Sequence, residues 1–209
     1  MSNPLLKVKG KKRSIESIDD PMKDELYVKI FKMAEPVRSL AAFLYLTGNR
    51  VSEVIGIPAA DNPDRDLESW VNRPLRKYDV EVTPNWTMMR VKARTLKRKG
   101  RPTHTYVCRV DLEEEKRYFR LVYYYLISKQ DEEYLWNFSR YRAWKEINKA
   151  TGLPPHKLRG LRATRDAVVF ELDAIDLKNK FNWSNPAMAF HYASKSSHNI
   201  EEKLLRKRQ

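Results

Sequence analysis

The chain has 209 residues, which fits one medium-sized domain, and 42% of them are hydrophobic, enough to build a core. Lys and Arg number 41 against 27 Asp and Glu, and the net charge of +14 favours a polyanionic partner, in the first place nucleic acid. The single cysteine, Cys108, excludes an internal disulfide and a cysteine-based metal cluster, and the sequence has neither a signal-peptide pattern nor an apolar run of about 20 residues.

The first fifty residues predict a basic arm followed by two helices. Residues 1–20 place Lys and Arg among small and polar residues, which is typical of a flexible arm. Apolar residues at helical spacing follow, and Pro36 breaks that pattern. Residues 37–46 are apolar almost all round, so we expect a buried helix that ends near Gly48.

The middle of the chain predicts a small sheet. Residues 59–85 are rich in Asp, Asn and Pro, which favours loop with short extended pieces. Beyond them, residues 87–91 and 103–107 are β-prone and flank a tight basic centre at 97–101. A glycine-containing turn between two such runs is typical of a β-hairpin.

Helices are expected again after the hairpin. Residues 113–129 gather apolar and aromatic side chains on one face, and Ser139 can cap the helix that follows. A third helix is expected over about 157–173, and Pro186 suits the first turn of a short last one. The inward face of the third helix should carry Leu158, Leu161, Val168 and Leu172. The chain is therefore predicted to be mostly α-helical with a small antiparallel β-sheet, an α+β fold.

A first chemical motif lies where the apolar helix ends, in the sequence Thr-Gly-Asn-Arg-Val-Ser-Glu. Gly48 permits a sharp turn that projects Arg50 outward. Glu53 follows one helical turn later, where its carboxylate could hold the guanidinium of Arg50. An ordinary capped junction between two helices would explain this motif equally well if it stood alone.

A second motif, His-Lys-Leu-Arg, puts His156 and Arg159 on one face of a helix start. Two neighbouring cations are costly unless an anion binds between them, and a phosphate is the natural complement. Arg162 and Arg165 extend the basic stripe, which we expect to face DNA or solvent.

Two aromatic residues complete the set. Trp183 precedes Tyr192 by nine residues, and Tyr192 stands beside His191 and ahead of a polar tail. Aromatic side chains are most often part of a core, but the polar neighbours of Tyr192 favour a position near the surface.

Together these segments resemble the tyrosine recombinase family, which includes phage and archaeal viral integrases and the Xer recombinases. The family carries its first arginine in a Thr-Gly-x-Arg-x-Ser-Glu motif and its second in His-x-Leu-Arg, and a His or Trp precedes the nucleophilic Tyr by nine residues. The match spans residues 47 to 192 in the family's order. Gly160 departs from the pattern, since the family usually has a second His there, and the helical DNA-clamping domain that normally precedes the catalytic one does not appear in the sequence.

The resemblance implies a catalytic domain over residues 21–198 that cleaves and rejoins DNA through a covalent 3′-phosphotyrosine at Tyr192, with viral genome integration as one possible setting. It implies no cofactor and no metal. Arg50 and Arg159 would bind the scissile phosphate, and the hairpin would supply the general acid. The implied catalytic residues are Arg50, Lys97, His156, Arg159, Trp183 and Tyr192, with Glu53 and Lys99 in support, Lys99 being the second choice for the acid.

Double-stranded DNA is the expected partner, without a membrane, in a cytoplasmic or nucleoid-associated setting. The DNA-binding residues are predicted to be Arg94, Arg98, Arg101, Arg162 and Arg165. The family implies a homotetramer on DNA, and the tail at 199–209 would form a helix that contacts a neighbouring protomer or folds back on its own domain. Two alternatives remain: a type IB topoisomerase-like enzyme, and a DNA-binding protein of recombinase descent that no longer cleaves.

Overall fold

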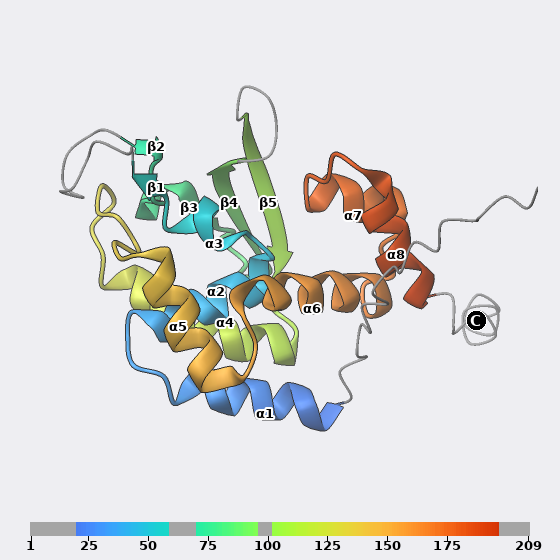
Figure 1. Ribbon diagram of the computed structural model, residues 1–209, viewed down its shortest axis with the longest axis horizontal. Coiled ribbons are helices and arrows are strands. Elements are labelled where there is room, and N and C mark those ends of the chain that lie inside the picture. The colour runs from blue at the N-terminus through green and yellow to red at the C-terminus, as the bar shows by residue number, and fades with distance from the viewer. Residues whose placement is uncertain (1–19, 59–69, 96–101, 197–209) are drawn as a thin grey trace, which may run out of the picture.

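The computed structural model describes residues 20–58, 70–95 and 102–196 (Figure 1). The predicted basic arm, apart from Asp20 at the start of α1, lies outside these residues, as do Lys97 and Lys99 and the C-terminal tail. The helices are α1 Asp20–Phe31, α2 Val37–Thr47, α3 Val51–Val54, α4 Glu113–Ile127, α5 Arg140–Thr151, α6 Pro155–Val168, α7 Ala174–Lys180 and α8 Pro186–Ser196, with a 3-10 turn, η1, at Lys77–Asp79. The strands are β1 Ile57–Pro58, β2 Trp70–Asn72, β3 Val80–Val82, β4 Met88–Arg94 and β5 Thr103–Arg109.

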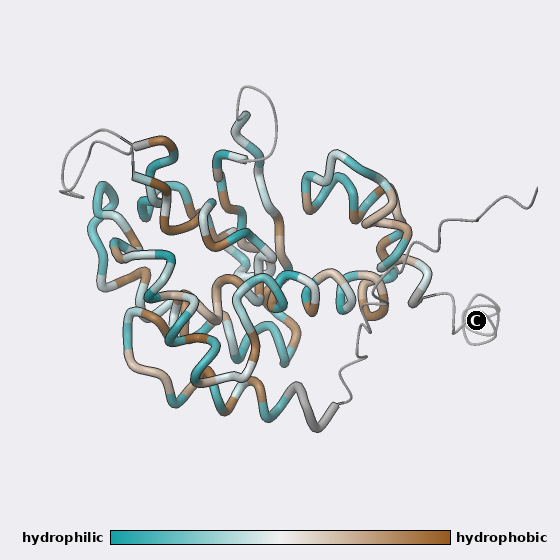
Figure 2. Tube along the Cα trace, viewed as in Figure 1, coloured by the Kyte–Doolittle hydropathy of each residue, from teal (hydrophilic) through white to brown (hydrophobic). Residues whose placement is uncertain are grey.

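Helix α2 forms the centre of the main core. Of its eleven residues, all but Arg38 are buried, as its continuous apolar sequence predicts. It packs against α4 and α6, and α1 and α5 cover it further (Figure 1). Hydrophobic residues gather where these helices meet the sheet, while the outer turns are largely hydrophilic (Figure 2).

The predicted hairpin is present and is part of a three-stranded antiparallel sheet in the order β3-β4-β5. Val91 of β4 pairs with Tyr106 of β5, and Ala93 pairs with His104. Alternate residues of both strands are buried, because successive side chains of a strand point to opposite faces. The prediction of a mostly helical domain with a small antiparallel sheet is confirmed, and β1 and β2 add a second, two-stranded sheet.

Helix α6 is shorter than the sequence pattern suggested. It begins at Pro155, a residue whose fixed φ suits a first turn, and it ends at Val168 instead of about residue 173. The chain then turns at Glu171, which has a φ of 53°. Val168 therefore does not point inward as predicted; its side chain is 43% exposed.

A second, smaller hydrophobic cluster joins α6 to α7 and α8 and holds two of the predicted site residues. Its buried members are Ala163, Ala167, Leu177, Phe181, Trp183, Ala189 and Tyr192. The small side chains of α6 let the aromatic rings of the C-terminal segment approach the helix closely. This cluster fixes the C-terminal helices beside the second half of α6.

Candidate active site

Arg50 stands at the junction between α2 and α3, and its side chain is held as the spacing predicts. Gly48 ends α2 with a φ of 66°, which glycine adopts without steric cost. The guanidinium Nη1 of Arg50 donates to Oε1 of Glu53 at 2.6 Å, and the backbone N–H of Arg50 donates to Oε2 at 2.8 Å. Glu53 is completely buried, whereas the side chain of Arg50 keeps 23% of its surface exposed. The carboxylate thus orients a cation whose other face remains open.

Tyr106 of β5 is a further partner of Glu53 that the sequence analysis did not identify. Its hydroxyl donates to Oε2 of Glu53 at 3.2 Å. Burial and the nearby charge of Glu53 raise the pKa of Tyr106 to about 12, so the phenol keeps its proton near neutral pH. The alternation of β5 places this residue on the inward face, but nothing local in the sequence indicates its partner.

Arg159 lies one turn into α6 and is 8% exposed. Its Nη2 donates to the carbonyl of Phe181 at 2.6 Å, and its Nη1 donates to the carbonyl of Gly48. A guanidinium has five N–H donors, so these two bonds leave others for a further acceptor. Burial, and after it the charge of Arg50, lowers the pKa of Arg159. The two cations therefore repel each other, and a bound anion would relieve that repulsion.

The rings of three residues form a stack beside Arg159. Phe181 and Trp183 lie 4.9 Å apart at 15°, and Trp183 and Tyr192 lie 5.5 Å apart at 13°. The guanidinium carbon of Arg159 is 5.1 Å from the Phe181 ring centre and 5.8 Å from that of Trp183. Tyr192 is only 9% exposed, so it is more deeply packed than its polar neighbours suggested. The stack fixes the plane of the tyrosine ring.

All the predicted catalytic residues that the structure describes line one pocket of about 410 Å³. Its walls come from the α2–α3 junction, the start of α6, and the segment that leads into α8. The lining residues are Arg50, His156, Arg159, Gly160, Asn182, Trp183, Ser184, Asn185, Met188 and Tyr192. His156 is exposed at the rim, while Arg159 and Tyr192 form the deeper wall. Two arginines and a tyrosine hydroxyl on one concave surface are suited to bind a phosphodiester and attack it.

The candidate general acids, Lys97 and Lys99, lie outside the described residues, as do Arg98 and Arg101. The strands that lead to them are described up to Thr95 and from Pro102. Both the backbone N–H and the side-chain hydroxyl of Thr95 donate to the carbonyl of Pro102 at 3.0 Å. Arg94, the last residue of β4, is exposed.

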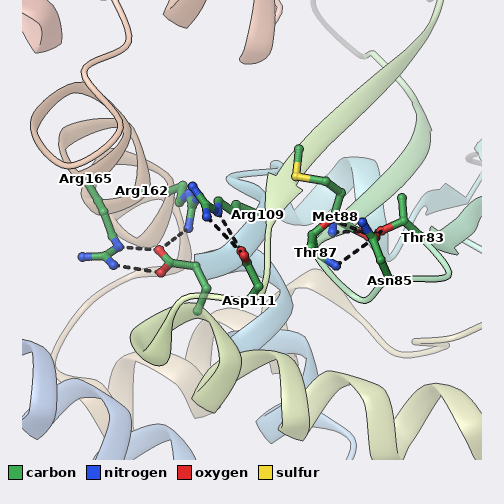
Figure 3. A network of polar contacts seen from close by, with 9 residues as sticks. Thr83, Asn85, Thr87, Met88, Arg109, Asp111, Arg162 and Arg165 are labelled. Carbon is green, nitrogen blue, oxygen red and sulfur yellow. Dashed lines mark hydrogen bonds and ion pairs between the residues drawn. The ribbon is translucent and has the colours of Figure 1, made fainter.

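The prediction that Arg162 and Arg165 face DNA is wrong. Arg162 has no exposed side-chain surface and pairs with Glu115 at 3.1 Å and with Asp166 at 2.9 Å. Arg165 is 10% exposed and its Nη2 donates to Glu115 at 2.8 Å (Figure 3). These side chains point toward the carboxylates of α4 and α6, because a charge taken out of water needs a partner. Their charges stabilise the packing of α6 and are not available to phosphates.

No protein-family model matches the chain, and no curated protein matches it in sequence. Solved structures do match. The post-cleavage complex of the XerH site-specific recombinase with its palindromic difH substrate superposes with a TM-score of 0.59 at 14% identity, over 92% of this chain and 53% of that one. The XerA recombinase superposes with a TM-score of 0.55 at 16% identity, over 100% of this chain and 70% of that one. The Tn1549 transposon integrase in complex with transposon right end DNA superposes with a TM-score of 0.51 at 14% identity, over 95% of this chain and 69% of that one.

The chain spans about half the length of the XerH recombinase, at 53%. These likenesses show that it has the fold of a tyrosine recombinase catalytic domain, as its motifs predict. Within the part of the chain that the structure describes, no helix is long and apolar enough to cross a membrane.

Proposed function

We propose that this domain cleaves and rejoins DNA strands with Tyr192 as its nucleophile. The observation that carries the proposal is the shared pocket, in which Tyr192 stands beside two arginines that come from distant parts of the sequence. The recombinase fold and the order of the motifs support the same function. The XerH and Tn1549 proteins are complexed with DNA in their solved structures, which supports duplex DNA as the partner of this chain.

The chemistry is an in-line displacement at a backbone phosphate. The phenolic oxygen of Tyr192 attacks phosphorus, loses its proton, and forms a 3′-phosphotyrosine bond as the bond to the 5′ oxygen breaks. The 5′ oxygen leaves with a proton from a general acid, so no bond energy is lost to water and the reverse attack reseals the strand. A tyrosine has an ordinary pKa of about 10, so the attack near neutral pH depends on a base and on nearby positive charge.

Arg50 and Arg159 would bind the non-bridging oxygens of the phosphate. Each is oriented in advance, Arg50 by Glu53 and Arg159 by two backbone carbonyls. Donors fixed before the reaction stabilise developing charge without reorganisation, and one such donor contributes on the order of 2.7–4 kcal/mol to lowering a barrier. His156, at the rim of the pocket, would accept or relay the proton of Tyr192. Trp183, the middle ring of the stack, would pack beside the phosphate and donate to it through its indole N–H.

The general acid would come from the turn of the β4–β5 hairpin, with Lys97 preferred over Lys99. Exposed basic residues such as Arg94 would neutralise phosphates along the duplex and make binding weaken steeply with salt. Recombination exchanges strands between duplexes, so the active assembly would be a homo-oligomer, a tetramer on DNA by the family's pattern.

Covalent trapping tests the proposal. The protein is incubated with a pool of nicked duplexes whose sequence is randomised around the nick, in buffer with a chelator and no added metal. Cleavage near a nick releases a short fragment that diffuses away and leaves the protein joined to DNA. We expect a denaturation-resistant adduct that is absent with Tyr192→Phe, and sequencing of the trapped DNA gives the preferred site. Salt-sensitive binding of the pool without an adduct would instead support the non-cleaving DNA-binding protein.

A further inference from the structure

Strand β5 contacts both halves of the catalytic pocket through side chains that lie two positions apart. His104 and Tyr106 share the inward face of the strand, and their rings meet edge to face with centres 4.7 Å apart at 87°. One half of the pocket is the α2–α3 junction with Arg50. The other half is the segment from Lys180 to Trp183, which leads from α7 into α8.

Tyr106 reaches the first half. Its hydroxyl donates to the same oxygen of Glu53, Oε2, that accepts the backbone N–H of Arg50. The second oxygen of that carboxylate holds the Arg50 guanidinium. A shift of β5 along or across the sheet would therefore change the position of Glu53 and, through it, of the cation.

His104 reaches the second half. Its ring nitrogen Nε2 lies 3.2 Å from the carbonyl oxygen of Lys180, so the ring donates there when Nε2 carries the proton. The Lys180 ammonium is bound by Asp166 at 2.7 Å, and the next carbonyl, that of Phe181, accepts from Arg159. The segment is thus fixed from α6 and from β5 at the adjacent residues Lys180 and Phe181. Trp183, whose indole stacks on Tyr192, follows two positions after Phe181.

We propose that His104 and Tyr106 are positioning residues. Tyr106 holds Arg50, through Glu53, in a fixed position relative to β5, and His104 does the same for the segment that places Tyr192. The inference rests on the proposed function, since it assigns these two residues a role in the same reaction. Neither side chain lines the pocket, so neither acts on the phosphate directly. Both side chains belong to β5, which pairs with β4 from Thr103 to Arg109, so one strand of the sheet relates the anchor of Arg50 to the segment before Trp183. Displacements of about 1 Å in such an arrangement can cost two orders of magnitude in rate.

The test uses two readouts on the full chain. The first is the rate of adduct formation on the trapping duplex. The second is the fluorine NMR resonance of Trp183 in protein labelled with fluorotryptophan and free of DNA, assigned by its disappearance in Trp183→Phe. The variants are His104→Ala, which removes the donor, and His104→Gln, whose amide nitrogen lies at nearly the same reach as Nε2. Thr105→Ala, on the exposed face of the same strand, is the matched control.

We expect His104→Ala to shift the Trp183 resonance and to slow adduct formation about tenfold, the effect of losing one partly buried hydrogen bond in the transition state. His104→Gln should restore both readouts to within about threefold of the original chain, and Thr105→Ala should change neither. Tyr106→Phe, which removes one oxygen, should slow adduct formation by a similar factor while DNA affinity stays the same.

An unmoved Trp183 resonance in His104→Ala, or a glutamine variant as impaired as the alanine variant, would overturn the role of His104. A Tyr106→Phe protein that forms adduct at the original rate would overturn that of Tyr106. If the unaltered chain forms no adduct at all, the proposed function fails, and the resonance still reports whether His104 positions Trp183.

Discussion

The hydroxyl of Tyr192 lies 3.1 Å from the point that a Cβ atom on Gly160 would occupy. Gly160 is in the middle of α6, directly after Arg159, and both residues line the pocket with the tyrosine. Tyrosine recombinases usually have a histidine at this position. In this chain the glycine leaves that space empty of side-chain atoms, and the hydroxyl of Tyr192 occupies it. With glycine at this position, the histidine that lines the pocket is His156, which is exposed at the rim.

Substitution of Gly160 with alanine should separate activity from stability. The added methyl group meets the Tyr192 hydroxyl at a distance tighter than ordinary contact, so the phenol must move. Alanine also favours a helix over glycine by about 1 kcal/mol. We expect Gly160→Ala to form adduct at least about tenfold more slowly without a lower melting temperature. Val168→Ala, exposed on the same helix, is the control. Adduct formation at the original rate would show that the tyrosine does not act from this position.

Arg50→Ala should impair chemistry more than binding. The variant loses one preoriented donor to the phosphate, for which we expect adduct formation to slow by about 10²–10³-fold. DNA affinity, measured by fluorescence anisotropy, should change much less, because many surface cations share the contacts with the backbone. Glu53→Gln keeps Arg50 but weakens the ion pair that orients it. Its rate of adduct formation should therefore lie between those of the original chain and Arg50→Ala. Equal losses of affinity and rate in Arg50→Ala would mean that Arg50 is an ordinary DNA contact.

The corrected position of Arg162 predicts opposite effects for two arginines. Arg162→Met removes the buried cation that bridges Glu115 and Asp166, and it leaves these carboxylates with Arg165 and Lys180 as their remaining partners. Breaking a buried charge network in this way should lower the free energy of unfolding by about 3–5 kcal/mol. Arg94→Ala should leave the unfolding free energy within about 0.5 kcal/mol and lower the slope of log affinity against log salt by about 0.9. Urea unfolding and salt titrations measure the two quantities. A reduced salt slope in folded Arg162→Met would contradict its buried position.

Glu115 should make the fold sensitive to acid. Burial alone would raise the pKa of Glu115, but the hydrogen bond from Arg165 and the charge of Arg162 outweigh it and hold the pKa below its usual 4.5. As the pH falls, Glu115 is therefore protonated in the unfolded chain at a higher pH than in the folded chain. Its stabilisation of the fold is complete above about pH 4.5 and is lost as the pH falls through the folded-state pKa. Urea unfolding near neutral pH and at about pH 3 measures how much the free energy of unfolding falls in acid. This fall should be smaller in Glu115→Gln than in the original chain. Glu113→Gln, exposed in the same helical turn, should keep the full loss.

Local sequence carries much of this structure. The apolar run of α2, its end at Gly48 and the β4–β5 hairpin follow from periodicity and turn chemistry. The ion pair of Arg50 with Glu53 follows from their spacing on a helix start. The spacing and order of the motifs also identified the residues that meet in the pocket, because each motif combines a turn or helix start with a charged or aromatic group.

Contacts between residues that are far apart in the chain could not be predicted from the sequence in the same way. Arg162 and Arg165 look like a solvated basic stripe because their partner Glu115 lies 47 and 50 residues away. Tyr106 takes part in the site only once β5 packs against α3, and the carbonyl of Phe181 only once the end of α7 meets Arg159 of α6. Their roles depend on tertiary packing, and a single sequence contains no local signal for it.

The most direct test of the account is to locate the DNA on the trapped protein. Digestion of the adduct with nuclease and trypsin leaves a nucleotide on the peptide that held the strand, and mass spectrometry identifies it. Cleavage after Lys180 and Lys195 gives a peptide of residues 181–195 in which Tyr192 is the only tyrosine. The account predicts that this peptide carries the nucleotide, with fragment ions that place the added mass on Tyr192. A nucleotide on a peptide from elsewhere in the chain would contradict it.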